Sequence, residues 1–257
     1  MATTTTLKMT GEDLRKNILS TYFTLRMGIV VLSAALPVGL YAYSLYVDHG
    51  LVETSMSAFY GAHDGAMRNW FVGGLCAIGA FLILYQGFSP LEDWLLNFAG
   101  GFAVLTAITP CDCWCDAGGD SSKWHQVFAI TFFACMASVV WFCAEDTITL
   151  LPTKALQDKY KRMYRGIAFG LVASPVAALA VSYVLQNYVS RTFYIEWFGV
   201  WVFAFYWLTK SAEFKITSAE KRALRGELKN VKGYGLAPAG APVPPPPPPP
   251  ETKRPNP

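Results

Sequence analysis

The stretch of sequence that decides the fold is RNWFVGGLCAIGAFLILYQGFSPLEDWLLNFAGGFAVLTAIT, residues 68–109. It contains two apolar segments, Trp70–Phe88 and Leu91–Thr109, which are separated only by a short turn at Ser89-Pro90. Each segment approaches the ~20 residues that a helix needs to cross a bilayer. The stretch therefore predicts a membrane hairpin with its polar groups at its ends.

The composition of the whole chain favours a membrane protein. Of the 257 residues, 53% are hydrophobic and only 15% are charged, a balance that is unusual for a soluble domain. We expect an all-α fold, a polytopic helical bundle with six transmembrane helices, and five or seven spans remain the alternatives. The predicted spans are Met27–Val47, Trp70–Phe88, Leu91–Thr109, Trp124–Ala144, Gly166–Gln186 and Tyr194–Thr209.

The basic residues predict an orientation in the membrane. With six spans and a cytoplasmic N-terminus, 18 of the 21 lysine and arginine residues fall on the cytoplasmic side, and only Arg68, Lys123 and Arg191 fall outside. Basic residues concentrate in cytoplasmic loops, so both termini are expected in the cytoplasm and the protein in the cytoplasmic (inner) membrane. The net charge of +3 then reflects topology, and the spacing of the basic residues contains no nucleic-acid-reading element.

Four regions are expected along the chain. Residues 1–22 form a Thr-rich leader and an interfacial helix that starts near Thr10, and they lack the apolar core of a cleavable signal. Residues 23–213 form the six-helix domain, and 214–234 form a basic amphipathic segment suited to an anionic membrane surface. Residues 235–257 form a disordered tail with the proline run Pro244–Pro250, which is either a stiff spacer or a ligand for a protein partner.

Small residues predict where helices pack closely. Spans two and three should pack tightly through small residues, namely Gly73, Ala77, Ala80, Ala99, Gly100 and Gly101. The fifth span has a small residue at every fourth position, which predicts contact with a neighbouring helix of the bundle or, alternatively, a homo-oligomer contact. These residues are Gly166, Gly170, Ser174, Ala178 and Ser182.

A polar segment in the first outer loop is the candidate lipid-binding or partner-binding site. Arg68 stands next to the start of the second span, where it either extends to the headgroup region or binds a lipid phosphate. Side chains that would add hydrogen bonds to such a phosphate are Ser55, Ser57, Tyr60 and Asn69.

A second group of outer residues has the chemistry of a metal or catalytic site. Histidine and cysteine are ligands for zinc or copper, and the candidates are His63, His125, Cys111, Cys113 and Cys115. A disulfide or an inert loop is the alternative for the three cysteines. The candidate catalytic residues are Ser57, His63, Asp64 and His125.

Several short motifs resemble those of a known group of proteins. The motifs are Ser57-Ala58-Phe59-Tyr60, Arg68–Gly73, Tyr85–Phe88, Glu92-Asp93 and Asn97–Gly100. They resemble a bacterial family of multi-span membrane proteins of unknown function, which is itself loosely similar to the damage-regulated autophagy modulator family. This resemblance implies six helices and membrane residence.

A more distant likeness is to the alkaline ceramidase and adiponectin-receptor superfamily of intramembrane zinc hydrolases. It implies that Ser57, His63 and Asp64 form the front of a hydrolytic site.

The sequence is therefore consistent with three alternative functions. The first is a non-enzymatic membrane protein that binds a lipid or a protein partner. The second is a membrane-embedded, metal-dependent hydrolase of a lipid amide or ester. The third is a small transporter, which needs polar residues inside the spans, and these are Asn97, Thr106, Thr131 and Ser174.

Overall fold

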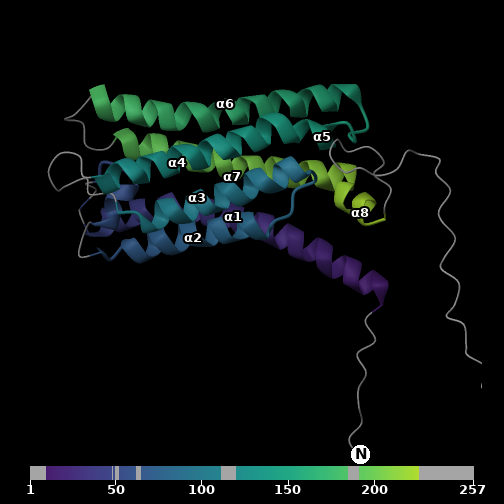
Figure 1. The fold of residues 1–257 in the computed structure, drawn as a ribbon, viewed down its shortest axis with the longest axis horizontal. Helices are drawn as coiled ribbons and strands as arrows, with labels where there is room; N and C mark the ends of the chain where they lie inside the picture. Colours follow the sequence, from purple (N-terminus) through teal and green to yellow (C-terminus); the bar gives the residue numbers. More distant parts are fainter. Residues whose placement is uncertain are drawn as a thin grey trace, which may run out of the picture.

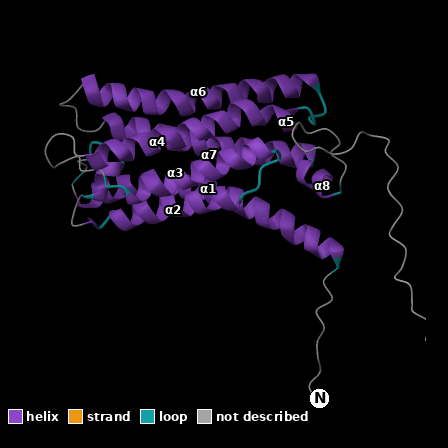
Figure 2. Cartoon of the chain, in the orientation of Figure 1, coloured by secondary structure: helices purple, strands orange, loops and turns teal. Residues whose placement is uncertain are grey.

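The structure, a computed structural model, describes residues 10–47, 49, 52–61, 65–110, 120–184 and 191–225. All regular secondary structure in these ranges is helical (Figure 2), which confirms the all-α fold. The elements in chain order are α1 (Gly11–Val47), the 3-10 helix η1 (Ser57–Tyr60), α2 (Arg68–Leu84), α3 (Pro90–Ile108), α4 (Asp120–Ser138), the π-helical η3 (Val139–Cys143), α5 (Ala144–Ile148), α6 (Lys154–Val184), α7 (Arg191–Thr217) and α8 (Ala219–Leu224).

The long helices lie side by side (Figure 1), and the contacts between them close a ring. In the ring α1 contacts α2, α2 contacts α3, α3 contacts α4, α4 contacts α6, α6 contacts α7, and α7 returns to α1. We name the two ends of the bundle by their short helices. The η1 end holds η1, whereas the α8 end holds α8, the start of α1 and the α2–α3 turn (Figure 1).

Several of these helices are long and apolar enough to cross a membrane. Four meet that standard by length and composition, and their bounds are Gly11–Val47, Pro90–Ile108, Lys123–Ile148 and Lys154–Val181. Helix α2 is apolar but has 17 residues. Helix α7 is longer than α2 but is not among the four, and its sequence includes the charged residues Glu196, Lys210 and Glu213. The protein is thus a helical membrane protein.

Three helices are longer than the predicted spans. The interfacial helix expected before residue 23 is continuous with the first span, because α1 begins at Gly11. Helix α6 begins at Lys154 and α7 continues to Thr217. In α7 the charged Lys210 and Glu213 are buried against other helices instead of ending the helix at the membrane surface, whereas the charged residues at the starts of α1 and α6 are exposed.

The structure describes only the start of the predicted basic segment 214–234. The chain reverses at Ser218, which has a φ of 50°, and α8 covers only Ala219–Leu224. Ala219 is fully buried, so the start of this segment packs on the bundle. The rest of the predicted amphipathic segment and the proline-rich tail, residues 226–257, lie outside the described residues, as does the leader 1–9.

Helices α2 and α3 touch through their backbones. A Cβ added to Gly79 would lie 2.7 Å from the carbonyl oxygen of Gly100, and one added to Gly100 would lie 2.6 Å from the carbonyl oxygen of Gly79. The predicted close packing of spans two and three is therefore confirmed, but its centre differs. Gly73 and Gly101 point into open space, since helix packing depends on the face and not only on the residue type.

The small residues of α6 mainly face α7. A Cβ on Gly170 would meet Val202 at 3.1 Å, and a Cβ on Gly199 would meet Ser174 at 2.5 Å. Both contacts confirm an internal neighbour for this part of the stripe. Gly166 has nothing within 4 Å of an added Cβ, and the side chain of Ser182 lies outside the described residues.

The α2–α3 contact generates a prediction. We expect Gly100→Ala to destabilise the bundle by about 1–3 kcal/mol, the usual effect of overpacking, because the new methyl group meets backbone rather than a flexible side chain. Gly101→Ala, on the next residue of the same helix, is the matched control and should not destabilise, because its Cβ enters open space. Unfolding by titration with a denaturing detergent measures both, and equal losses would contradict the contact.

Candidate functional site

A cavity of about 270 Å³ lies at the η1 end, between η1, α4, α6 and α7. Most of its wall is apolar and comes from α4 and α6. The polar residues that line it are Thr54, Ser55, Ser57, His125, Gln126, Ser174, Thr192 and Glu196. It therefore has a polar side, which is formed mainly at the η1 end and is called the rim below, and an apolar side, a combination that is common in ligand sites.

The rim segment before and within η1 is fixed by its own hydrogen bonds. The Ser55 hydroxyl accepts from the Ala58 backbone N–H at 3.1 Å and lies 3.0 Å from the Ser57 hydroxyl. The Met56 backbone N–H donates to the Glu196 carboxylate at 2.6 Å. The latter bond ties the segment to α7, so Ser57 is held at the cavity by contacts from two sides.

His125 is buried at the start of α4, and its tautomer follows from its partner. Its Nδ1 lies 2.9 Å from the carbonyl oxygen of Thr109. A carbonyl oxygen only accepts hydrogen bonds, so Nδ1 carries the proton in this arrangement. In the neutral imidazole Nε2 then keeps a free electron pair, which suits it to accept a hydrogen bond from a ligand or to act as a base.

Ser174 adds a polar group to the α6 wall. Its hydroxyl is buried and has no hydrogen-bond partner among the described residues. A buried hydroxyl without a partner loses free energy relative to water. A ligand hydroxyl or carbonyl that entered the cavity would supply that partner.

The structure divides the residues that the sequence placed in one lipid site. Ser55 and Ser57 line the cavity, whereas Tyr60, Arg68 and Asn69 do not. The Arg68 guanidinium instead donates to the Tyr60 carbonyl oxygen at 2.8 Å and lies 4.8 Å from the centre of the Tyr60 ring. Arg68 is thus occupied by a local contact beside the cavity.

Of the residues proposed for catalysis or metal binding, Ser57 and His125 line the same cavity. His63 and Asp64 lie outside the described residues, and so do Cys111, Cys113 and Cys115. Within the described ranges, no group of three or more histidine, cysteine or acidic residues is placed to hold a metal ion. The zinc or copper site stays a prediction.

The residue that sequence reasoning missed is Glu196. It is the single acidic residue in the predicted span Tyr194–Thr209, and an acidic residue inside a span is by default a functional candidate. Two polar residues predicted for a transport path have local roles instead. The hydroxyls of Thr106 and Thr131 donate to carbonyl oxygens of their own helices, each at 2.7 Å.

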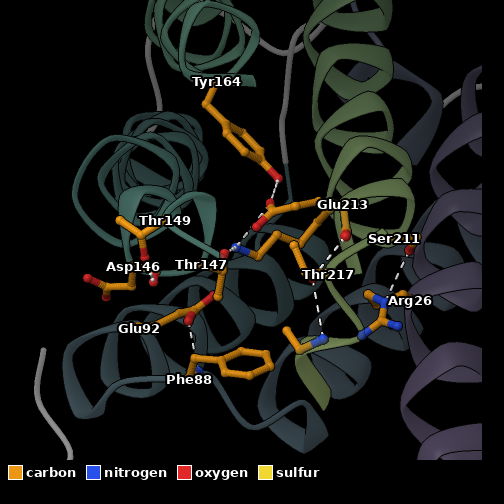
Figure 3. A network of polar contacts seen from close by, with 12 residues as sticks. Arg26, Phe88, Glu92, Asp146, Thr147, Thr149, Tyr164, Ser211, Glu213 and Thr217 are labelled. Carbon is orange, nitrogen blue, oxygen red and sulfur yellow. Dashed lines mark hydrogen bonds and ion pairs between the residues drawn. The ribbon is translucent and has the colours of Figure 1, made fainter. Parts of the chain in front are cut away.

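A second polar group lies at the α8 end, where buried charges connect α1, α7 and α8; Figure 3 shows the contact between Arg26 and Ser211. The Arg26 guanidinium of α1 pairs with both carboxylate oxygens of Glu220 on α8. It also donates to the Ser211 hydroxyl at 3.1 Å and to the Tyr85 hydroxyl at 3.4 Å. Arg26 is 2% exposed, so the pair has little competition from water.

A neighbouring group connects α7 to α5 and α6 (Figure 3). The Lys210 ammonium donates to the Thr147 hydroxyl at 2.7 Å and lies 3.7 Å from the Glu213 carboxylate. The Tyr164 hydroxyl donates to the same carboxylate. The other carboxylate oxygen of Glu213, Oε1, has no partner among the described residues.

Glu92 completes the buried charges from the α2–α3 turn. Its carboxylate accepts from the Phe88 backbone N–H at 2.8 Å, and its own N–H donates to the Ser89 hydroxyl at 3.2 Å. The capping serine and the acid in the first turn stabilise the start of α3. Its burial, at 1% exposed, was not predicted.

Comparisons with known proteins do not add to this description. The chain matches no protein-family model, and no curated protein and no solved structure is significantly similar to it.

The buried charges generate a prediction about stability. We expect Lys210→Met to lower the free energy of unfolding by about 3–5 kcal/mol, the usual effect of breaking a buried ion pair, because it leaves the fully buried Glu213 without its cation. Adding Glu213→Gln to this variant should restore part of the loss.

The control is the exposed pair of Lys161 with Glu145, whose side chains are 38% and 54% exposed. Lys161→Met should change the unfolding free energy by no more than about 1 kcal/mol. If Lys210→Met and Lys161→Met lowered the free energy of unfolding equally in a denaturing detergent, burial of the pair of Lys210 with Glu213 would contribute nothing to stability.

Proposed function

We propose that this protein is an integral protein of the cytoplasmic membrane that binds a membrane lipid in the η1-end cavity without chemically changing it. The observation that carries the proposal is the cavity with its polar rim and apolar wall. Its volume lies just below the roughly 300–1,000 Å³ of pockets that enclose a whole small ligand. It therefore suits one segment of a lipid, with the rest of the molecule in the bilayer.

The lining residues support this assignment. Ile130 on α4 and Leu179 on α6 line the cavity and are 37% and 39% exposed, so the cavity wall continues onto the bundle surface that would face acyl chains. Ser57, His125 and Gln126 stand at the polar rim. Hydroxyl, imidazole and amide groups form hydrogen bonds with the ester or headgroup oxygens of a lipid.

For the orientation we propose six crossings with both termini in the cytoplasm. The closed ring of six helices in chain order supports this, and so does the distribution of lysine and arginine. The η1 end would then face outward and the α8 end inward. A green fluorescent protein fused to the C-terminus of the full chain should fluoresce in a bacterial host, whereas a periplasmic alkaline phosphatase fused there should be inactive. An active phosphatase fusion would reverse the orientation.

The lipid proposal predicts the effect of filling the cavity. Ala178 on α6 lines the cavity and is buried, so Ala178→Phe places a ring inside it. We expect this variant to lose the lipid that remains bound to the wild-type protein, measured by native mass spectrometry after purification in a mild detergent.

Ala180→Phe is the matched control. Ala180 is on the same helix and exposed, and it does not line the cavity, so this variant should retain the lipid of the wild type. Equal lipid retention by wild type, Ala178→Phe and Ala180→Phe would contradict binding in the cavity.

One observation favours a lipid hydrolase as the second candidate: Ser57 and His125 line one cavity, and His125 has an Nε2 free to accept a proton. Incubation of the purified protein with lipid extract separates the candidates. Release of fatty acid that Ser57→Ala abolishes, while lipid remains bound, would establish hydrolysis. Bound lipid recovered intact from the wild type supports binding alone.

A further inference from the structure

The outer surface of α6 and α7 has a groove of about 510 Å³ that is separate from the η1-end cavity. Its floor is formed by Gly166 and Gly170 of α6, and its wall by Phe198, Trp201 and Phe205 of α7. Arg162 also lines it. None of these residues takes part in the site proposed above.

The groove exists because two turns of α6 have no side chain to fill it. A Cβ on Gly170 would meet Val202, whereas one on Gly166 would meet no atom within 4 Å. The aromatic rings of α7 leave the floor open, and the three wall residues are between 48% and 59% exposed. A groove of this kind in the membrane-facing surface accepts a flexible apolar chain by close contact with both helices.

Arg162 gives the groove a charged end. It lies one helical turn before Gly166, so the two residues share a face of α6, and it is towards the α8 end of the helix. Its side chain is exposed and has no hydrogen bond or ion pair with another described residue. From Arg162 to Gly170 the helix rises by roughly 12 Å. A lipid whose acyl chain lies along this length of the groove would place its charged headgroup at Arg162.

We propose that the groove binds one acidic phospholipid from the leaflet at the α8 end, with an acyl chain over Gly166 and Gly170 and the phosphate at Arg162. A guanidinium group binds phosphate through two parallel hydrogen bonds. A basic residue at the membrane surface also attracts anionic lipids electrostatically.

Charge favours a lipid over a second copy of this chain as the occupant. In a membrane, a two-fold dimer has its axis along the bilayer normal, so packing this face on itself brings each Arg162 to the same depth as its copy. Like charges repel there, whereas a lipid phosphate neutralises the arginine.

The test uses the full-length protein and a phosphatidylglycerol with a photoreactive group in its acyl chain, in vesicles that also contain phosphatidylcholine. We expect crosslinks to α6 and α7 around Gly166 and Phe205. Gly166→Leu should abolish them, because leucine fills the groove without meeting a neighbouring atom at its Cβ. The matched control is Gly101→Leu, which places the same side chain at another open glycine, on α3.

The charged end is tested by lipid competition. Arg162→Gln should lower the preference of the groove for phosphatidylglycerol over phosphatidylcholine about fivefold, the effect of one basic residue near an anionic surface. Lys159→Gln, on an exposed residue of the same helix, should leave the preference unchanged.

Three results would overturn the proposal: crosslinks that persist in Gly166→Leu, an unchanged preference in Arg162→Gln, or a dimer in detergent that Gly166→Leu dissociates. Ala178→Phe should leave the crosslinks around Gly166 in place. Failure of the cavity proposal and failure of the groove proposal are therefore distinguishable.

Discussion

The pairing of buried charges at the α8 end is the constraint on which the rest of the bundle depends. Arg26, Lys210 and Glu213 are each 2% exposed or less, and an unpaired charge in such a place would cost several kcal/mol. Their partners come from different helices. Lys210 and Glu213 pair within α7, whereas the contacts between helices are those of Arg26 with Glu220 of α8 and Ser211 of α7, of Glu213 with Tyr164 of α6, and of Lys210 with Thr147 of α5. Each of these contacts requires two helices to meet at one height, so together they fix how α1, α6 and α7 are aligned along the ring.

Helix α7 also connects the α8 end of the bundle to the η1 end. Helix α7 is held by Lys210 and Glu213 at one end and presents Glu196 at the other. Glu196 accepts the hydrogen bond that holds the η1 segment, and this segment forms the rim of the cavity. Helix α7 thus carries residues of the buried charge network at one end and a residue that positions the cavity rim at the other.

Small residues and aromatic residues have different roles in the ring. Where two glycines face each other, as Gly79 and Gly100 do, the backbones touch and no space remains. Where a glycine has no neighbouring atom at its Cβ position, as Gly166 has none, a groove remains, and aromatic rings of α7 line it. The same residue type therefore produces either a tight contact or a binding surface.

The sequence by itself determined that the chain is a bundle of long apolar helices, because apolar runs near twenty residues leave no other way to satisfy the backbone in a membrane. It also marked Ser55, Ser57 and His125 as polar residues of one end. It did not place Arg26 and Lys210 in the interior, since composition alone assigns arginine and lysine to the membrane surface. Only the tertiary structure decided which faces meet: it put Gly79 rather than Gly73 at the α2–α3 contact, added Glu196 to the cavity rim, and left Arg68 out of the cavity lining. The physical reason is that these contacts join residues far apart in the chain, and the rotation of each helix about its axis depends on its neighbours.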